Sequence, residues 1–244
     1  GITKVRLTGG EPLVRPDAVG IIRDLSGLGV SLGLTTNALS LHKHLDALIE
    51  AGLRSINISL DTFDAERFKQ IARRDGFGTV WANIRSAMSR GLRVKVNMVV
   101  MRGVNDDEIL RFMELTREHP VHVRFIEFMP FAGNHWGRDR VYTFAEMLGH
   151  IGSVHSFEKL HDDPHSTAKA YRVPGWPGTF AVISTVTEPF CGDCDRLRLT
   201  AEGRMRNCLF AREETDLLSA LRRGEDIAPL IEANVIAKHA MLGW

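Results

Sequence analysis

The sequence predicts an α/β fold built on a parallel sheet, which we take to be a partial (βα) barrel. Strand-like and helix-like segments alternate through the first half of the chain. This alternation at short spacing is typical of parallel sheets, either barrels or open doubly wound sheets. No Gly-x-Gly-x-x-Gly turn follows any strand-like segment. The dinucleotide-binding version of the open sheet is therefore disfavoured.

The expected strands are short segments with alternating or β-branched apolar residues. They cover residues 4–7, 31–35, 55–60, 94–101 and 121–128. Helical periodicity between them predicts helices that begin near Asp17, Leu41, Asp64, Thr79 and Ile109. Asp17 is placed to cap the first helix, and Asn105 with Glu108 resembles a capping box before the last.

The pattern changes after Pro130, where we place a domain boundary. Residues 1–130 are expected to form the partial barrel and residues 131–244 a C-terminal region. In that region Thr143 and Glu146 form a capping box for one helix. Residues 171–173 and 179–185 resemble antiparallel strands, and two further helical stretches begin at Asp216 and Ile227.

Composition excludes several function classes. The 244 residues carry a net charge of +1, which argues against a nucleic-acid or membrane partner. No apolar run approaches the roughly 20 residues of a membrane helix. The three cysteines lie in one short stretch, which indicates metal ligation in a reducing, cytoplasmic setting rather than disulfides. The chain begins at Gly1, already beside a strand, so we expect a segment to be missing before it.

Basic side chains occupy unusual positions on the predicted strands. Strand alternation puts Lys4 and Arg6 on one face, and likewise Lys95 and Arg124, opposite the apolar positions that the helices cover. These cations should point into the barrel, where unpaired charge is costly. Their candidate internal partners are Glu11, Asp61 and Glu127. A structural ion-pair network is one interpretation, and a bound polyanion such as a nucleoside triphosphate is the other.

A Gly-Gly-Glu-Pro segment, residues 9–12, directly follows the first strand. Two glycines allow the backbone to approach a ligand closely, although a simple β-to-α turn explains them equally well.

The strongest chemical pattern is Cys191-x-x-Cys194 followed by Cys208. Such a pair can chelate one metal centre while a third thiolate folds back to it, which leaves one position open. A closed zinc site with a distant fourth ligand and a disulfide with a free thiol are the alternatives. Arg196 and Arg198 follow the pair, where they suit either a charged ligand or a solvated strand face.

Together these motifs resemble the GTP 3′,8-cyclase family of radical S-adenosylmethionine (SAM) enzymes. The matching segments are residues 8–12 (TGGEP), 35–37 (TTN), 57–61 (NISLD), 95–97 (KVN), 124–129 (RFIEFM), 190–199 (FCGDCDRLRL) and 208–210 (CLF). They keep the family's order and cover nearly the whole chain.

The resemblance implies a partial TIM-like barrel of the radical SAM type with a C-terminal iron–sulfur extension. In that family, a lyase class, one [4Fe-4S] cluster cleaves SAM, and the resulting radical abstracts the ribose 3′ hydrogen of GTP. The sugar carbon then attacks guanine C8, giving 3′,8-cyclo-7,8-dihydroguanosine 5′-triphosphate for molybdenum cofactor (molybdopterin) biosynthesis. A cyclic pyranopterin monophosphate synthase is the implied pathway neighbour. The electron donor and the oligomeric state, including a homodimer, stay open.

The resemblance also assigns roles to residues. Those implied to contact SAM are Gly10, Ser59 and Met129. Those implied to contact GTP are Arg6, Thr35, Lys95, Arg196, Leu197 and Arg198, with Lys4 and Arg124 as weaker candidates. Those implied to hold a C-terminal [4Fe-4S] cluster, whose open iron binds guanine, are Cys191, Cys194 and Cys208.

Some features depart from the family's pattern. The Cys-x-x-x-Cys-x-x-Cys motif of the radical-generating cluster is absent, so that second [4Fe-4S] cluster is expected in the full-length protein alone and this chain is expected to be inactive by itself. The family's C-terminal Gly-Gly is missing, and Ala38 stands where the family often has Gly. A peptide-modifying radical SAM enzyme and a non-catalytic zinc-binding module remain the alternative functions.

Overall fold

A computed structural model describes residues 1–131, 133–189, 192 and 194–238. The chain divides into two compact units, which we describe separately. Unit 1 comprises Gly1–His161 and Ala168–Thr187, and unit 2 comprises Asp162–Thr167 and Glu188–Trp244. This division lies well beyond residue 130, where the alternation of strands and helices in the sequence breaks off. The proposed domain boundary at 130 stays a prediction about domain organisation.

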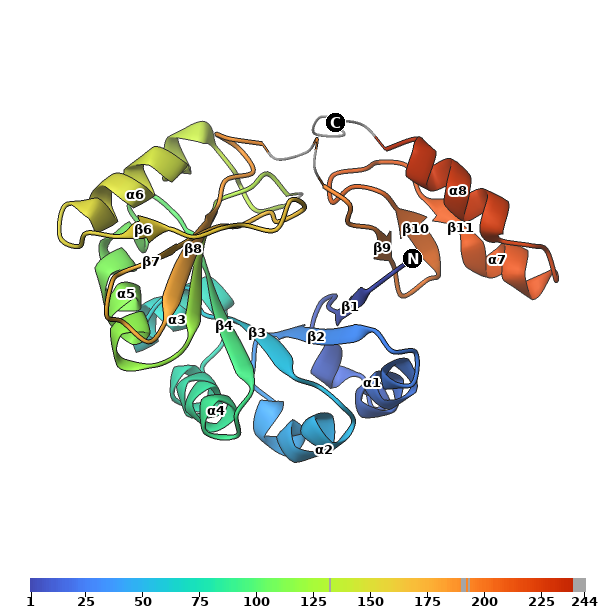
Figure 1. Ribbon diagram of the computed structural model, residues 1–244, viewed down its shortest axis with the longest axis horizontal. Coiled ribbons are helices and arrows are strands. Elements are labelled where there is room, and N and C mark those ends of the chain that lie inside the picture. The colour runs from blue at the N-terminus through green and yellow to red at the C-terminus, as the bar shows by residue number, and fades with distance from the viewer. Residues whose placement is uncertain (132, 190–191, 193, 239–244) are drawn as a thin grey trace. The chain divides into compact units, whose positions relative to one another are not determined.

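Unit 1 is built on one sheet with the strand order β1-β2-β3-β4-β5-β8-β7-β6 (Figure 1). Its strands are β1 (Lys4–Leu7), β2 (Ser31–Thr36), β3 (Ser55–Ser59), β4 (Arg93–Val100), β5 (His122–Glu127), β6 (Glu158–Lys159), β7 (Lys169–Arg172) and β8 (Thr179–Ile183). Strands β1 to β5 and β8 pair in parallel, whereas β7 and β6 continue antiparallel. The predicted parallel, barrel-like sheet is confirmed.

Helices connect the strands. They are α1 (Ala18–Ser26), α2 (Leu45–Glu50), α3 (Ala65–Ala72), α4 (Phe77–Ser89), α5 (Ile109–Glu118) and α6 (Phe144–Gly152), with single 3-10 turns η1 (Pro12–Val14), η2 (Leu41–Lys43), η3 (Asp106–Glu108) and η4 (Arg138–Arg140). The capping box of Thr143 and Glu146 before α6 is present as predicted.

Two predicted caps are wrong. The Asp17 carboxylate makes no cap bond and pairs with Arg15 at 2.5 Å. Asn105 also makes no cap bond before η3. Its amide donates to the carbonyl oxygens of Asp61 and Val99 instead, at 2.7 and 2.9 Å. Other side-chain contacts therefore replace the predicted caps, a neighbouring arginine for Asp17 and two carbonyl oxygens for Asn105.

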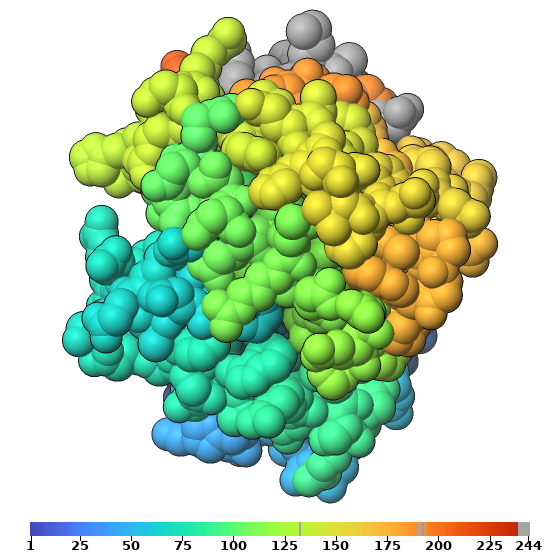
Figure 2. All heavy atoms as spheres, turned by 90° about the vertical axis from the view of Figure 1, so that its left-hand side faces the viewer, coloured from blue at the N-terminus to red at the C-terminus, as the bar shows by residue number. Residues whose placement is uncertain are grey.

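The sheet has one apolar and one polar face. The helices run along its convex side (Figure 1), and the strand residues on that side are buried core residues such as Ile56, Val96 and Phe125. Figure 2 shows the atoms of α4, α5 and α6 following one another up the outside of unit 1. The alternate strand residues, most of them polar, line the concave side.

The pairing of β8 with β5 requires one close backbone approach. A Cβ on Gly178, at the turn before β8, would lie 2.6 Å from the carbonyl oxygens of His119 and Val121. Glycine therefore lets this turn pack against the end of α5, so that β8 can join β5.

Unit 2 contains a small antiparallel sheet, β11-β10-β9, and two helices. Its elements are β9 (Arg198–Leu199), β10 (Arg204–Arg206), β11 (Thr215–Asp216), α7 (Leu217–Arg222) and α8 (Ala228–Ile236). Between Cys194 and Cys208 the chain forms the hairpin of β9 and β10, with Gly203 at a φ of +73° in its turn. Within the described part of the chain, every helix falls short of what a bilayer crossing requires.

Candidate functional site

The concave face of the unit 1 sheet carries a row of polar side chains across neighbouring strands. Strand register places Thr35 beside Asn57, Asn57 beside Lys95, and Lys95 beside His122. Neighbouring strands are about 4.8 Å apart, so these side chains share one small region.

The adjacent row, nearer the carboxyl ends of the strands, places Ser59 beside Asn97 and Asn97 beside Arg124. Arg6 lies on the same face of β1. A Cβ added to its neighbour Gly33 would lie 3.4 Å from the Arg6 guanidinium carbon, so the guanidinium lies across the bare backbone of Gly33. The structure thus brings Arg6, Thr35 and Lys95 onto one surface, as predicted for a shared site.

Buried polar atoms on this face lack partners among the described residues. Nη1 of Arg6 and Nε of Arg124 donate no hydrogen bond, and Oδ1 of Asn57 and Oδ1 of Asn97 accept none. Unmade hydrogen bonds of buried groups cost about 1–3 kcal/mol each. Such groups therefore indicate a place where a ligand completes the site.

Charge repulsion marks the same region. Burial, and then the cations Arg124, Lys4, Arg6 and Arg93, lower the pKa of Lys95 to about 7.

Burial likewise lowers the pKa of Arg124 to about 10, with a further effect of Arg6. Burial and the charges of Arg124 and Lys95 lower the pKa of His122 to about 3. The His122 imidazole is therefore neutral at pH 7, and its Nδ1 lies 2.8 Å from the Thr179 hydroxyl.

The predicted internal partners of these cations are wrong. In the described part of the chain, Glu11, Asp61 and Glu127 each bind backbone amides or hydroxyls, and no ion pair joins them to Arg6, Lys95 or Arg124. The three carboxylates expected in a structural ion-pair network thus do not pair with these cations, which disfavours that interpretation.

Two carboxylates fix the loops at the carboxyl ends of β2 and β3 in the same way. Glu11 accepts from the Thr36 hydroxyl at 2.7 Å and from the Asn37 amide at 2.6 Å. Glu108 accepts from the Thr62 hydroxyl and, at 2.7 Å, from the Phe63 amide. Each carboxylate thus holds a threonine and the residue after it. Glu11 of the Gly-Gly-Glu-Pro segment therefore stabilises the loop after β2.

The glycines of that segment differ in their demands. Gly9 adopts a φ of +140°, which side chains rarely allow. Gly10 is exposed, and a Cβ there would meet nothing within 4 Å. Its backbone is therefore accessible to a ligand beside the end of β1. Ala38 takes a φ of +60°, which accounts physically for a glycine preference at that position.

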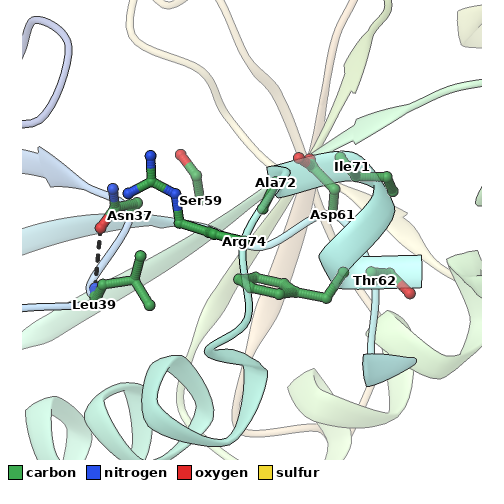
Figure 3. A pocket seen from close by; sticks show the side chains of 9 residues that line it. Asn37, Leu39, Ser59, Asp61, Thr62, Ile71, Ala72 and Arg74 are labelled. Atoms are coloured by element: carbon green, nitrogen blue, oxygen red, sulfur yellow. Dashed lines mark hydrogen bonds between the residues drawn. The ribbon is translucent and has the colours of Figure 1, made fainter. Parts of the chain in front are cut away.

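A pocket of about 230 Å³ lies between the two fixed loops (Figure 3). It is lined by Asn37, Leu39, Ser59, Asp61, Thr62, Phe68, Ile71, Ala72 and Arg74. Burial raises the pKa of Asp61 to about 6, although its Oδ1 accepts from the Val99 amide. Ser59, a predicted SAM contact, is thus part of a cavity with both polar and apolar walls. Asp61 and Arg74 line the same pocket, although neither was predicted to contact SAM.

The carboxyl end of β5 is organised by Glu127, which is fully buried. Its oxygens accept from the amides of Phe144, Val186 and Thr187 at 2.9, 2.7 and 3.0 Å, and from the Thr187 hydroxyl. Glu127 therefore fixes the start of α6 and the segment by which the chain leaves unit 1.

Met129 follows two residues after β5, and its carbonyl oxygen accepts from the Asn134 amide group at 2.7 Å. The predicted SAM contacts Gly10, Ser59 and Met129 thus all lie at the carboxyl ends of the sheet strands or just beyond them, where parallel sheets bind ligands.

In unit 2, Cys194 and Cys208 are free thiols and both are partly exposed. Cys191 lies outside the described residues. Arg198 lies near both described thiols, because each of them acts electrostatically on its guanidinium. Burial is the largest influence on that group and lowers the pKa of Arg198.

Cations surround the Cys194 sulfur. Arg196 Nε lies 3.4 Å from it and Lys238 Nζ lies 3.7 Å from it. Burial opposes ionisation of this thiol, yet the Arg196 hydrogen bonds and the charges of Arg196 and Lys238 outweigh it and lower the pKa of Cys194. A thiol that ionises readily is a good metal ligand. The sequence did not predict a role for Lys238, because it lies 44 positions from Cys194 and only the folded chain brings the two together.

The described residues contain no group of three metal-ligating side chains. The two described thiols nevertheless fit a thiolate-ligated centre in donor type and charge. Leu197 is half-buried between Arg196 and Arg198, the arginine pair predicted to contact GTP.

Comparison with protein families gives two matches. The Radical SAM superfamily matches residues 1–116, and the family Molybdenum Cofactor Synthesis C matches residues 121–242.

Among curated proteins, Molybdenum cofactor biosynthesis protein 1 of Mus musculus is 47% identical over 242 residues, covering 96% of this chain and 38% of that protein. The mitochondrial GTP 3′,8-cyclase of Arabidopsis thaliana is 45% identical, over 95% of this chain and 60% of that protein. The GTP 3′,8-cyclase of Moorella thermoacetica is 42% identical, over 99% of this chain and 75% of that protein. The chain thus spans less than two thirds of the animal and plant relatives.

Solved structures show the same fold at low identity. Streptococcus suis SuiB bound to S-adenosylmethionine aligns with a TM-score of 0.63 and 14% identity, over 89% of this chain and 54% of that one. A radical SAM methyltransferase from Sphaerobacter thermophilus aligns with a TM-score of 0.53 and 19% identity, over 84% and 55%. The expected partial TIM-like barrel of the radical SAM type is confirmed. From its family matches and its relatives, the chain belongs to the radical SAM superfamily and, within it, to the GTP 3′,8-cyclase family of molybdenum cofactor biosynthesis.

Proposed function

We propose that the protein is a GTP 3′,8-cyclase, a lyase that converts GTP to 3′,8-cyclo-7,8-dihydroguanosine 5′-triphosphate. The observation that carries this proposal is the concave face of unit 1. There Nη1 of Arg6 and Nε of Arg124 are buried without a hydrogen-bond partner among the described residues, and Lys95 lies beside them. A triphosphate supplies the negative charge and the acceptor oxygens that these groups lack.

Residue roles follow from this placement. Arg6, Lys95 and Arg124 bind phosphate oxygens, and Thr35 donates or accepts a hydrogen bond in the same row. Lys4, at the edge strand, contributes charge at the rim. For Arg196, Leu197 and Arg198 the GTP contact rests on the family resemblance alone.

SAM binds at the carboxyl ends of the strands. The exposed backbone of Gly10, the hydroxyl of Ser59 and Met129 contact it. Glu11 and Glu108 hold the surrounding loops, so that the pocket wall near Ser59 keeps its shape when the ligand arrives.

Cys191, Cys194 and Cys208 hold a [4Fe-4S] cluster that, when bound, supplies an open coordination position for the substrate. The cationic surroundings of Cys194 favour the thiolate that such a cluster requires. The cluster that cleaves SAM needs ligands beyond these three cysteines. We therefore propose that residues 1–244 alone do not start the reaction.

The proposal extends to the protein's surroundings. A cyclic pyranopterin monophosphate synthase consumes the product, a strong one-electron reductant of unidentified type supplies electrons, and the location is cytoplasmic. Sedimentation velocity tests a homodimer, and cell fractionation tests the location.

The activity test uses the whole protein, reconstituted anaerobically with iron and sulfide and given SAM, a reductant and GTP. We expect 5′-deoxyadenosine and a cyclised GTP product in equal amounts. Arg124→Met should abolish the product, whereas Arg117→Met, an exposed arginine of α5, should not. Equal loss in both variants, or no GTP-dependent product from wild type, would contradict the proposal.

The cluster is tested separately by metal analysis and EPR. Iron with labile sulfide, and an EPR signal that GTP alters and Cys194→Ala removes, supports the cysteine site. Zinc without iron would instead favour a zinc-binding module.

A further inference from the structure

Lys95 stands at the centre of the cationic group. Facing it are His122 and Arg124 from β5, Lys4 and Arg6 from β1, and Arg93 from its own strand. The side chain from β3 that neighbours it is the uncharged Asn57, with Thr35 beyond it on β2 and Thr179 next to His122 on β8.

The inward positions of these strands carry no carboxylate. Position by position, the inward residues are Lys4 and Arg6; Ser31, Gly33 and Thr35; Ser55, Asn57 and Ser59; Arg93, Lys95, Asn97 and Val99; His122, Arg124 and Ile126; and Thr179, Ala181 and Ile183. A ligand-free concave face therefore holds excess positive charge, which repulsion within the group penalises.

Few members of the group can relieve that repulsion. Arginine side chains stay protonated at physiological pH. His122 is already neutral. The ammonium group of a half-buried lysine among arginines is the one that gives up its proton most readily.

We propose that a polyanion on the concave face binds together with one proton, which Nζ of Lys95 takes up from solvent. In the proposed function the polyanion is the triphosphate of GTP, and the inference rests on that function. The step balances as Lys95–NH₂ + H⁺ + triphosphate giving Lys95–NH₃⁺ with the bound triphosphate. Anionic oxygens between Lys95 and its arginine neighbours reverse the sign of its surroundings and favour the charged form.

Proton uptake makes binding depend on pH. Because the pKa of free Lys95 is lowered to about 7, the binding-competent form falls from about one half at pH 7 to about one hundredth at pH 9. The affinity for GTP should therefore fall about fiftyfold across this range. Below pH 6 Lys95 is protonated already, so its titration should no longer make the affinity depend on pH.

Isothermal titration calorimetry measures the uptake directly. Whole protein is titrated with GTP at pH 8.0 in buffers of different ionisation enthalpy, and the slope of binding enthalpy against ionisation enthalpy counts protons. At this pH the terminal phosphate, whose last pKa is about 6, has lost its own proton. We expect uptake of about 0.9 proton at pH 8.0. At pH 6.0 the terminal phosphate is itself about half protonated, and the uptake by wild type and by Lys95→Arg should differ there by only about 0.1 proton.

The matched variant is Lys95→Arg, which keeps the charge and removes the titration. It should bind GTP with no uptake and with a flat pH dependence from 7 to 9. Guanosine, which lacks phosphates, should cause no uptake in wild type. Equal uptake in wild type and Lys95→Arg, or none in wild type, would overturn the inference.

Two further arms separate this result from failure of the proposed function. Inorganic tripolyphosphate should likewise show a greater uptake with wild type than with Lys95→Arg, a difference that cancels the protons which the ligand itself loses. Proton uptake with tripolyphosphate but no binding of GTP would support the coupling of polyanion binding to protonation of Lys95. It would contradict the proposal that GTP is the ligand. If Lys95→Arg does not fold, NMR of ¹³Cε-labelled lysines in wild type gives the answer. One lysine resonance should report a pKa near 7 in the free protein and above 9 with tripolyphosphate. If every lysine instead titrates near its ordinary value, the inference is overturned.

Discussion

Replacing Glu127 with alanine should destabilise unit 1 strongly, because this buried carboxylate at the end of β5 is the shared acceptor of two other segments. Its oxygens accept from the amides of Phe144, Val186 and Thr187, and from the Thr187 hydroxyl. The variant leaves three backbone amides without an acceptor, of which those of Phe144 and Val186 belong to half-buried residues. At about 1–3 kcal/mol each, with partial relief from water entering the space, the free energy of unfolding should fall by about 3–5 kcal/mol.

Urea denaturation followed by circular dichroism measures this loss. Glu127→Gln keeps one acceptor oxygen and should lose about 2 kcal/mol. Glu118→Ala, an exposed acid at the end of α5, is the control and should stay within about 0.5 kcal/mol of wild type. A Glu127→Ala protein within about 1 kcal/mol of wild type would refute the reasoning, since these bonds would then contribute little.

Three other changes test the site. Lys95→Met should raise the free energy of unfolding at pH 7 by about 2 kcal/mol while weakening GTP binding. Burial and cations lower the pKa of Lys95 in the folded protein, so wild type loses stability as the pH falls from about 10 to 7. The difference in stability between the two proteins, measured by urea denaturation, should therefore disappear near pH 10. Gly33→Val should displace the Arg6 guanidinium and weaken GTP binding about tenfold by calorimetry, whereas Gly33→Ala, whose Cβ makes ordinary contacts, should bind normally; equal binding by both would contradict this. Glu108→Ala should cost about 2–4 kcal/mol in thermal unfolding and weaken SAM binding, and unchanged SAM affinity would show that its loop does not shape the pocket.

Strand periodicity was a good guide to unit 1. Alternation placed Arg6, Lys95 and Arg124 on the face opposite the core, and the structure confirms it, because a two-residue period follows directly from strand geometry. The predicted capping box of α6 is also confirmed, since it depends on residues close together in the sequence.

Other features depend on contacts between distant segments, which periodicity does not show. Glu11 and Glu127 were expected to pair with cations, yet backbone amides of distant loops take their oxygens. The parallel pairing of β8 with β5, which extends the sheet, depends on Gly178 fitting against the end of α5. Lys238 reaches Cys194 across 44 positions of sequence. None of these has a local pattern.

The central claim is that the concave face of unit 1 holds the triphosphate of GTP. Calorimetric titration of the whole protein with GTP and with guanosine tests it most directly, in wild type and in Arg124→Met. We predict that wild type binds GTP at least tenfold more tightly than guanosine, and that Arg124→Met loses this preference while it binds guanosine as before. Equal affinity of wild type for the two ligands, or a phosphate preference that survives in Arg124→Met, would contradict the account.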